Sequence, residues 1–516
     1  MKNILPSWET PNLLASCLLP SILRETQGRF ASWLVFLILL INAQLTGELP
    51  AVAEPVPTEP KQSETSQGIC VEQLDAAITE VIERPEFARS RWGILVEPLS
   101  SSTHLYSHEG ERYFTPASNA KLLTTAAALH QLGEQFSIRT SVFSTGTIPD
   151  LASLQVVGRG DPSLTTAELK DLAQQLKGRG VRRVEQLIVE EGYFKEPAIH
   201  PTWEWSDIYT YYGAPVNSLI LNENAAILRL MPQELGQPLQ LSWDDTIASS
   251  QWQVENQTTT AAAGTPSSIQ ILGVLGEPVL QITGQMAVDA EPDIWALAIL
   301  NPADYFLDSF RQILAEVGIT VNQALVVTSP QTIEPKTELA AVESDLGDWL
   351  IPINQDSNNL YAEALFNTFG AESNADSGIA ALQQSLTALG VDPETYFITD
   401  GSGLSRHNRV SPEAIVQTLK LMAQTPEAEV YRASLPVAGV SGTLKHRFQD
   451  TPLQGNLQAK TGGMTGVSAL SGYLDLPNYQ SLVFSVMVNR TEQPAAIQRQ
   501  AINEIVLLLG SLRRVC

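Results

Sequence analysis

Two side chains that could carry out acyl transfer stand three residues apart, at Ser118 and Lys121. A serine hydroxyl is a poor nucleophile at neutral pH, but a desolvated lysine amine with a lowered pKa can take its proton. Pro116 favours a helix start before the Ala- and Leu-rich run 122–132, and Gly133 favours its end. Both side chains then share one helix face, about one turn apart. Taken alone, the pattern is explained more simply by a helix start with a solvated lysine.

Two further short patterns follow along the chain. Ser357-x-Asn359 stands just before a predicted helix at 360–368, and Lys460-Thr461-Gly462 lies within the last hundred or so residues. The missing side chain at Gly462 would let a ligand or another chain segment approach a strand closely. Each pattern is common by itself. The three in this order, behind an export signal, are hard to obtain by chance, and such sets occur in penicillin-binding proteins and serine β-lactamases.

Composition describes a globular chain of more than one domain. The 516 residues are too many for one core, and two or three domains are expected. With 31 basic against 56 acidic residues, the net charge is −25, so nucleic acid is an unsuitable partner. The three cysteines show no CxxC spacing, which gives no support to a zinc or redox site. His104 and His108 lack the glutamate of an HExxH motif and indicate a polar strand or loop.

Residues 1–53 have the character of a targeting segment. Arg24 and Arg29 precede an apolar run at 30–41, and the small residues at 51–53 fit a cleavage site. A signal peptide is therefore predicted, with an exported, periplasmic or cell-envelope protein as the consequence. The positive region is unusually long, so an uncleaved N-terminal anchor, which would be the chain's one membrane contact, stays an alternative. Residues 54–66 indicate a flexible linker.

Periodicity predicts an α/β protein with a helical later part. Apolar spacing at 70–84 favours a helix, and 91–97 with 103–107 favours a strand hairpin. Strands and helices alternate from 141 onward, short strands fill 233–290, and helices dominate 345–425. Further strands and helices are predicted at 141–145, 154–157, 166–177, 184–190, 295–300, 305–317, 324–327, 468–474, 481–489 and 494–512.

The chain resembles the class C low-molecular-mass penicillin-binding proteins, the D-alanyl-D-alanine carboxypeptidase/endopeptidase family, over residues 70 to 515. The long insertion between Ser118 and Ser357 is typical of that family and not of β-lactamases. The position after Lys-Thr-Gly is often Ser or Thr in relatives and is Gly463 here, where a backbone N–H would still be available. The other supporting segments are 116–121, 212–216, 400–405 and 460–466.

The resemblance implies a penicillin-binding-protein/β-lactamase-like transpeptidase core, with an antiparallel sheet flanked by helices. Such a catalytic domain would combine residues 67–140 with 346–516. Residues 141–232 and 291–345 would form an inserted α/β domain, and 233–290 a small β-rich domain within it.

The resemblance also implies a role for each site residue. Ser118 would attack the carbonyl of a D-Ala-D-Ala bond, and Lys121 would accept its proton. Ser357 would relay a proton to the leaving amine, while Asn359 would orient the substrate and hold Lys121. Lys460 would lower the pKa of Lys121 by like-charge proximity. The substrate's carboxylate would be bound by Lys460 and Thr461, and the oxyanion by the backbone N–H groups of Ser118 and Gly463. Peptidoglycan peptides and β-lactams are the implied partners, with no cofactor or metal.

Two further residues are candidates for reading the diamino acid of the stem peptide. Asp207 lies within an aromatic cluster and suits an ammonium group, and Arg406 follows a tight turn and suits a carboxylate. The resemblance suggests a pocket near these segments. An interdomain salt bridge or a surface charge explains the two residues equally well.

Two competing functions are considered. A serine β-lactamase would need a deacylation base, and the one Glu-x-x-x-Asn spacing between the motifs, Glu363 to Asn367, falls inside a predicted helix and indicates helix surface or packing. A wall-binding scaffold without activity is the other alternative, and the intact Ser118, Lys121 and Lys460 argue against it.

A disulfide between Cys70 and Cys516 is the last expectation. Loss of Cys17 with the signal would leave an even pair in an oxidising compartment. Folds of the resembled type bring the first and last helices together on one sheet. Two free thiols at loose termini remain the alternative.

Overall fold

The computed structural model describes residues 68–514 apart from 330–336, 374 and 478. The predicted signal segment and linker, residues 1–66, therefore lie outside the described residues. Among the helices that are described, none combines the length and the apolar character needed to cross a membrane.

The catalytic motifs are carried by a five-stranded antiparallel sheet and the helices on it. The strand order is β16-β17-β18-β1-β2, so β1, from near the start of the described chain, pairs with the C-terminal hairpin from Arg91 opposite Asn489 to Pro98 opposite Leu482. The five strands are β1 (Arg91–Pro98), β2 (Tyr106–His108), β16 (Leu457–Met464), β17 (Val467–Leu474) and β18 (Leu482–Asn489). The predicted antiparallel sheet is confirmed.

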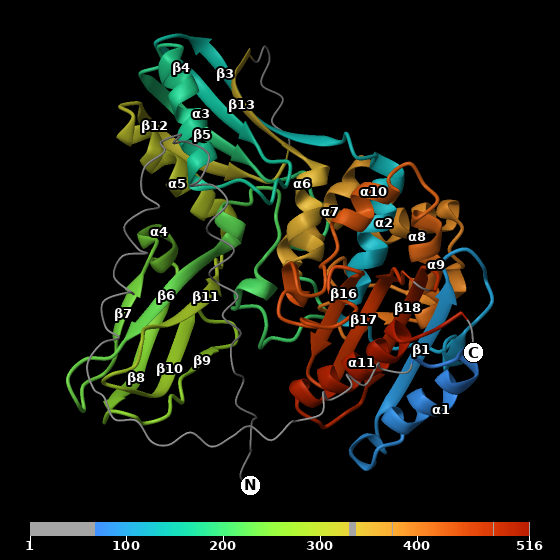
Figure 1. Cartoon of the computed structure of the whole chain (residues 1–516). Coiled ribbons are helices and arrows are strands. Elements are labelled where there is room, and N and C mark those ends of the chain that lie inside the picture. The colour runs from blue at the N-terminus through green and yellow to red at the C-terminus, as the bar shows by residue number, and fades with distance from the viewer. Residues whose placement is uncertain (1–67, 330–336, 374, 478, 515–516) are drawn as a thin grey trace, which may run out of the picture. The chain divides into compact units, whose positions relative to one another are not determined.

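Helices cover both faces of this sheet, as alternation along the strands requires. In β1, Ile94 and Val96 face the core formed with two helices, α1 (Val71–Ile82) and α11 (Ala495–Gly510), which lie side by side as expected (Figure 1). Leu95 faces the opposite core, which holds a larger helical group. That group is α2 (Ala120–Leu132), α6 (Leu346–Asn354), α7 (Asn359–Glu372), α8 (Gly378–Leu389), α9 (Pro412–Met422) and α10 (Ala428–Ala433).

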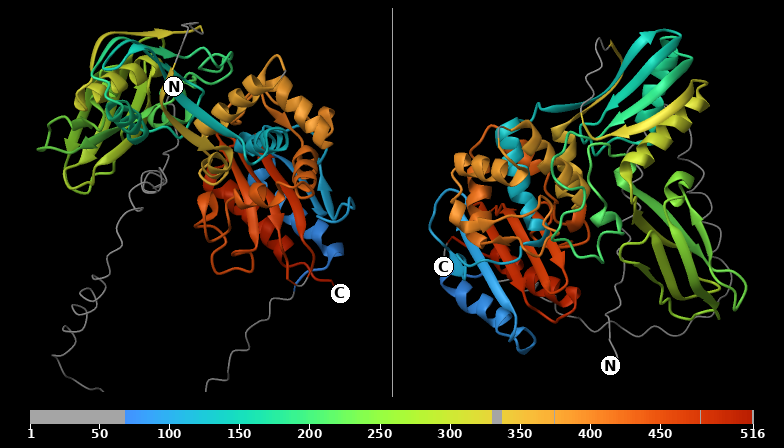
Figure 2. Two further views of the ribbon diagram at one scale, coloured as in Figure 1. Left: turned by 90° about the horizontal axis from the view of Figure 1, so that it is seen from above. Right: turned by 180° about the vertical axis from the view of Figure 1, so that it is seen from behind.

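The helix α2, cyan in Figure 2, lies among the other helices of its face and contacts α6, α7, α8 and α9, while α9 packs on the sheet. A 3-10 turn, Ala117–Asn119, leads into it, and every residue from Ala120 to Leu129 is buried. Gly133 ends it with a φ of 77°, a conformation that suits glycine. The small and apolar residues of the run thus allow close packing on all sides, which also buries Lys121.

Between α2 and α6 the chain forms a second, mixed five-stranded sheet in the order β12-β5-β4-β3-β13. The strands β12, β5 and β4 are parallel, whereas β3 pairs antiparallel with β4 and β13. Two helices, α3 (Thr166–Gly178) and α5 (Pro302–Glu316), share its hydrophobic core. The strands are β3 (Ser137–Thr147), β4 (Asp150–Val157), β5 (Arg183–Glu190), β12 (Thr320–Val327) and β13 (Thr337–Asp345).

Two three-stranded sheets complete the inserted part, in the orders β8-β10-β9 and β11-β6-β7. They share one hydrophobic core, to which Leu228, Ile282 and Leu297 contribute. The predicted boundaries, after 232 and after 290, assign β6 and β11 to the inserted α/β domain, whereas both strands lie in this pair of small sheets. The domain limits themselves stay a prediction. The strands and the short helix here are β6 (Ala225–Met231), β7 (Gln240–Trp243), α4 (Thr246–Ser249), β8 (Gln253–Ala261), β9 (Gln270–Gly273), β10 (Val279–Ala287) and β11 (Asp293–Ala298).

The two ends of the described chain are tied to each other. Ile69 N–H donates to the Ser511 carbonyl at 3.0 Å, and Arg513 N–H donates to the Ile69 carbonyl at 3.1 Å. Cys70 is disulfide-bonded. Since Cys17 and Cys516 lie outside the described residues, the pairing of Cys70 with Cys516 stays a prediction.

Candidate active site

The Lys121 amine makes three short polar contacts at the start of α2. Its Nζ lies 3.0 Å from Ser118 Oγ, 2.6 Å from Asn359 Oδ1 and 2.6 Å from the Ser402 carbonyl oxygen. Ser118 stands on the 3-10 turn, half-buried, while Lys121 is fully buried in the first turn of α2. The pair therefore has the geometry of a nucleophile beside a base.

Burial lowers the pKa of Lys121 from 10.5 to about 7, and the nearby acids Asp400 and Glu363 oppose that shift. An amine with this pKa is about half neutral at pH 7. The lysine can thus act as a base where an exposed lysine would be almost wholly protonated.

Ser357 and Asn359 stand at the start of α7, on the other side of the site. Asn359 accepts from Lys121 and donates from Nδ2 to the Tyr212 carbonyl at 2.8 Å, so both ends of its amide are held. Ser357 has a φ of 61°, a costly conformation for a residue with a side chain, and such strain often marks functional positions. The residue between them, Asn358, caps α7 by accepting from Tyr361 N–H at 3.1 Å.

Lys460 comes from β16 and closes the third side. Its Nζ donates to Ser357 Oγ at 2.8 Å and to the Thr461 carbonyl at 3.1 Å. Burial, followed by repulsion from Lys121, lowers the pKa of Lys460 well below its usual value, while Asp356 opposes the shift. Repulsion between the two lysines thus contributes to the shift of Lys460, and burial is the main cause of the shift of Lys121; that Lys460 also lowers the pKa of Lys121 stays a prediction.

The strand β16 approaches the nucleophile turn through its glycine. A Cβ on Gly462 would lie 2.7 Å from the Pro116 carbonyl oxygen, so the close approach predicted at this glycine is made by the segment that carries Ser118. Thr461 donates from Oγ1 to Thr443 Oγ1 at 2.8 Å, and Gly463 is exposed at the mouth of the site. The three motifs thus meet in one place, from α2, α7 and β16.

Asp207 and Arg406 belong to a neighbouring polar cluster. Asp207 accepts from Tyr212 O–H at 3.2 Å; burial and Glu204 raise its pKa, while Tyr212 and Arg406 oppose the rise. Arg406 donates to Glu204 at 2.9 Å and to the Thr465 carbonyl at 3.1 Å. The salt bridge therefore exists, with Glu204 as the partner of Arg406.

The segment 200–216 contributes more to the site than its sequence revealed. The Tyr212 carbonyl orients Asn359, and Trp203 Nε1 donates to Asp400 Oδ2 at 3.0 Å. A backbone carbonyl has no side-chain signature, and the aromatic cluster suggested mainly packing. Tyr209 is indeed buried in the core of the small sheets, whereas Trp205 is half exposed.

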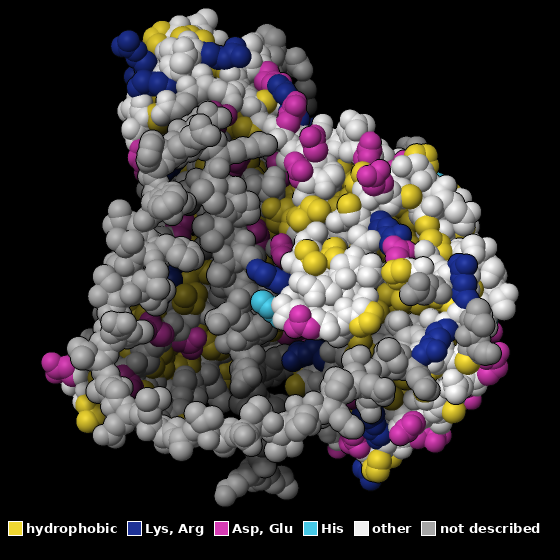
Figure 3. Space-filling model, in the orientation of Figure 1, with side chains coloured by type: hydrophobic (Ala, Val, Ile, Leu, Met, Phe, Trp, Pro, Cys, Tyr) yellow, Lys and Arg dark blue, Asp and Glu magenta, His cyan; other side chains and the backbone are white. Residues whose placement is uncertain are grey.

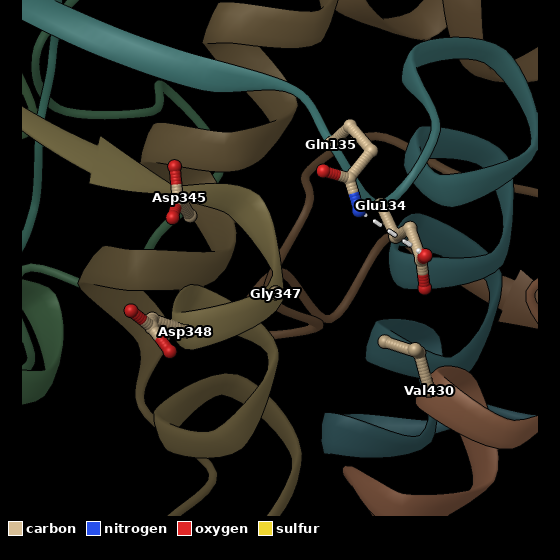
Figure 4. A pocket seen from close by; sticks show the side chains of 6 residues that line it. All are labelled: Glu134, Gln135, Asp345, Gly347, Asp348 and Val430. Atoms are coloured by element: carbon tan, nitrogen blue, oxygen red, sulfur yellow. Dashed lines mark hydrogen bonds between the residues drawn. The ribbon is translucent and has the colours of Figure 1, made fainter.

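Two cavities lie away from the three motifs. One, of about 270 Å³, is lined by Glu134, Gln135, Asp345, Gly347, Asp348 and Val430 (Figure 4). The other, of about 330 Å³, is bordered by β3 residues together with Arg159, Tyr193 and Glu372. Within the described chain, no cluster of three or more His, Cys, Asp or Glu side chains could hold a metal ion. On the face drawn in Figure 3, acidic side chains are scattered and interspersed with Lys and Arg.

Comparison with known proteins gives one consistent family. The model of the D-Ala-D-Ala carboxypeptidase 3 (S13) family matches residues 74–510. A D-alanyl-D-alanine carboxypeptidase of Actinomadura sp. (strain R39) is 31% identical over 485 residues, covering 90% of this chain and 87% of that protein. A penicillin-sensitive carboxypeptidase A of Dictyostelium discoideum is 28% identical, covering 81% of this chain and 87% of that protein.

A solved structure shares the fold. Penicillin binding protein 4 of Haemophilus influenzae superposes with a TM-score of 0.74 at 24% sequence identity, covering 86% of this chain and 98% of that one. The same protein has also been solved in complex with a β-lactam. The penicillin-binding-protein fold expected from the sequence is thereby confirmed. By its sequence match, the chain belongs to the D-Ala-D-Ala carboxypeptidase 3 (S13) family.

Proposed function

We propose that this serine D-Ala-D-Ala carboxypeptidase cleaves peptidoglycan stem peptides through an acyl-enzyme on Ser118, and that penicillin acylates the same hydroxyl. The observation that carries the proposal is the Lys121 amine, which lies 3.0 Å from Ser118 Oγ and is held by two other acceptors. The buried amine accepts the hydroxyl proton as Ser118 attacks the carbonyl carbon of the scissile bond.

The attack produces a tetrahedral intermediate with a negative oxygen. The backbone N–H groups of Ser118 and Gly463 are our candidates for stabilising it. Ser357 Oγ accepts from Lys460, so its own hydroxyl proton is left to donate to the leaving amine. The proton that Lys121 took from Ser118 then passes to Ser357, which restores the hydroxyl and the neutral amine. Departure of D-alanine leaves the ester on Ser118, and a water molecule then hydrolyses it with Lys121 again as the base.

Recognition of a free C-terminal carboxylate is assigned to Lys460 and Thr461. An incoming carboxylate would favour the charged form of the Lys460 amine, which burial and Lys121 disfavour, and would add a charge-assisted hydrogen bond. The Thr461 hydroxyl lies on the same strand and now bonds to Thr443.

For the stem-peptide diamino acid, we infer that Asp207 and Arg406 contact its two charged ends. Tyr212, whose carbonyl holds Asn359, places Asp207 beside the site through its hydroxyl. Arg406→Ala should reduce the preference between a meso-diaminopimelate peptide and a lysine peptide, and Asp207→Ala should slow both. Unchanged rates and unchanged preference would refute this assignment.

Stem peptides lie outside the cytoplasm, so we also propose that the protein is exported to the periplasm or cell envelope through its N-terminal segment. Immunodetection of the full-length protein in periplasmic, membrane and cytoplasmic fractions tests this. A cytoplasmic location would contradict it.

Fluorescent penicillin labelling, followed by turnover of a D-Ala-D-Ala peptide, tests the function. Slow release of the label together with peptide cleavage supports the peptidase. Rapid hydrolysis of penicillin would indicate a β-lactamase instead, and absence of labelling would indicate a scaffold. The structure offers no reason to favour the β-lactamase, because Glu363 is inside α7 and its carboxyl bonds to backbone N–H groups.

A further inference from the structure

Glu363 is a buried acid that the mechanism above leaves without a role. It lies in the second turn of α7 and is 5% exposed. Its carboxyl accepts two backbone hydrogen bonds from the turn at 400–405: Gly401 N–H at 3.1 Å on Oε2 and Ser402 N–H at 2.7 Å on Oε1. Burying an acid costs more free energy than burying an apolar side chain of similar size. A buried acid with two such partners is therefore a candidate for a functional role.

The held turn packs directly on α7. A Cβ on Gly401 would lie 2.5 Å from Phe366 Cβ and 2.9 Å from the Ala362 carbonyl oxygen, so only a glycine lets the turn approach this closely. The other side of the turn is held by Asp400, which accepts from Gly403 N–H at 2.9 Å. The position of the Ser402 peptide is thus determined by one acid on each side.

The Ser402 carbonyl is one of the three polar neighbours of Lys121, at 2.6 Å. Asn359, another of them, stands four residues before Glu363 on the same helix, so the two side chains lie on one face of α7. One helix therefore provides the first acceptor directly, and positions the second through the turn.

The two acceptors decide where the base points. A neutral lysine amine has two N–H donors and one lone pair. When Asn359 Oδ1 and the Ser402 carbonyl take the two donors, the lone pair remains for the third neighbour, the Ser118 hydroxyl. If the Ser402 carbonyl moved away, an N–H could turn toward Ser118 Oγ, and the amine would be a donor where it must accept.

We propose that Glu363 is a positioning residue for the Lys121 base: its carboxyl fixes the Ser402 carbonyl through two backbone N–H groups, and that carbonyl directs the amine's lone pair to Ser118. This rests on the proposed acyl-enzyme function. The residue acts through the turn and through Lys121, and it does not touch the substrate.

The pH dependence gives a second readout. The ionisable groups around Glu363 are Asp400 in the held turn and Lys121 on α2, and Tyr212 lies on the 3-10 turn Tyr211–Gly213 that packs on α7. Burial and Asp400 raise the pKa of Glu363 to about 8, whereas Lys121 titrates at about 7. Glu363 is therefore mostly neutral where Lys121 loses its proton, and an uncharged glutamine in its place should leave the pKa of Lys121 almost unchanged.

The test compares Glu363→Gln with the wild type and with Glu372→Gln, a matched substitution at the exposed end of the same helix. The glutamine keeps one acceptor, but its NH₂ group opposes the second backbone N–H and displaces the Ser402 peptide. Stopped-flow acylation by a fluorescent penicillin across pH gives the rate at saturation and the affinity before the covalent step.

For Glu363→Gln, we expect an acylation rate at saturation at least about tenfold lower, an affinity within about twofold of the wild type, and the acid limb of the pH–rate profile in its wild-type place. Glu372→Gln should match the wild type in all three. A Glu363→Gln rate within about twofold of the wild type, or a rate loss that comes from an acid limb moved to higher pH, overturns the proposal.

Two controls keep the outcome interpretable. If Glu363→Gln does not fold, Glu363→Asp keeps a carboxyl group but shortens its reach. This variant should lower the acylation rate and leave the acid limb in place, and a wild-type rate would overturn the proposal. Labelling of the wild type at Ser118 is measured in the same series. Its absence would refute the proposed function, whereas normal labelling of wild type and Glu363→Gln alike refutes this inference alone.

Discussion

Raising the pH from about 6 to about 8 should speed the acylation of Ser118 by a β-lactam roughly tenfold, because Lys121 must be neutral to accept the hydroxyl proton. Burial brings the pKa of Lys121 from 10.5 to about 7. With that pKa, the neutral fraction rises from about a tenth to about nine tenths over this interval. Above pH of about 8 the rate should level off.

The size of the effect follows from the same shift. At pH 7, an exposed lysine with a pKa of 10.5 would be neutral in about 3 molecules in 10,000, against about half for Lys121. Burial thus increases the available base by about three orders of magnitude, which corresponds to roughly 4 kcal/mol at 1.36 kcal/mol per pKa unit.

The assay is stopped-flow acylation at saturating penicillin, so that binding through Lys460 does not enter the rate. The pH profile is measured again at higher ionic strength, to show whether the titrating group lies at the surface. The pKa of the buried amine should change little, because salt screens a buried charge poorly. A flat profile between pH of about 6 and about 8, or a rise that continues to about pH 10, would refute Lys121 as the base with the lowered pKa.

Three further predictions concern the surroundings of the base. Lys460→Ala should reduce kcat/KM for peptides with a free C-terminal carboxylate by about tenfold or more beyond the loss for amidated peptides, which also lose the Lys460 hydrogen bond to Ser357; equal losses would remove the carboxylate role. Gly403→Ala would put a Cβ 2.0 Å from the carbonyl oxygen of Ala117, the residue before Ser118, so acylation should slow strongly. The control Gly455→Ala, also at positive φ but in open space, should alter only stability. Equal acylation rates in the two variants would refute the clash. Non-reducing peptide mapping should yield Cys70 linked to Cys516, and two alkylatable thiols would exclude the bridge.

The sequence predicted those elements whose local pattern determines them. The helix after Ser118 follows from small and apolar residues ending at Gly133, and the final hairpin from two largely apolar runs separated by a turn. Patterns of this kind say that a strand exists, but not which strand it pairs with. The strands at 225–231 and 293–298 therefore gave no sign that they would join the small sheets.

The sequence predicted the side chains of the site, but not the groups that position them. Ser118, Lys121 and Asn359 belong to motifs with recognisable spacing, and the structure brings them within hydrogen-bond distance. The Ser402 carbonyl carries no signal, since every residue has such a group. Glu363 was seen only as part of a helix, because its burial depends on a turn that lies 37 or more residues further along the chain.

The most direct test of the acyl-enzyme is to locate the bound penicillin by peptide mapping and intact mass, in the wild type and in Ser118→Ala. We expect one adduct per wild-type chain, on the peptide that contains Ser118, and no adduct on the folded variant. Ser118→Ala should keep its structure, because the lost hydroxyl is half-buried and Lys121, to which it hydrogen-bonds, keeps two other polar contacts. Stoichiometric labelling of the variant at the wild-type rate, or an adduct mapped to another residue, would contradict it.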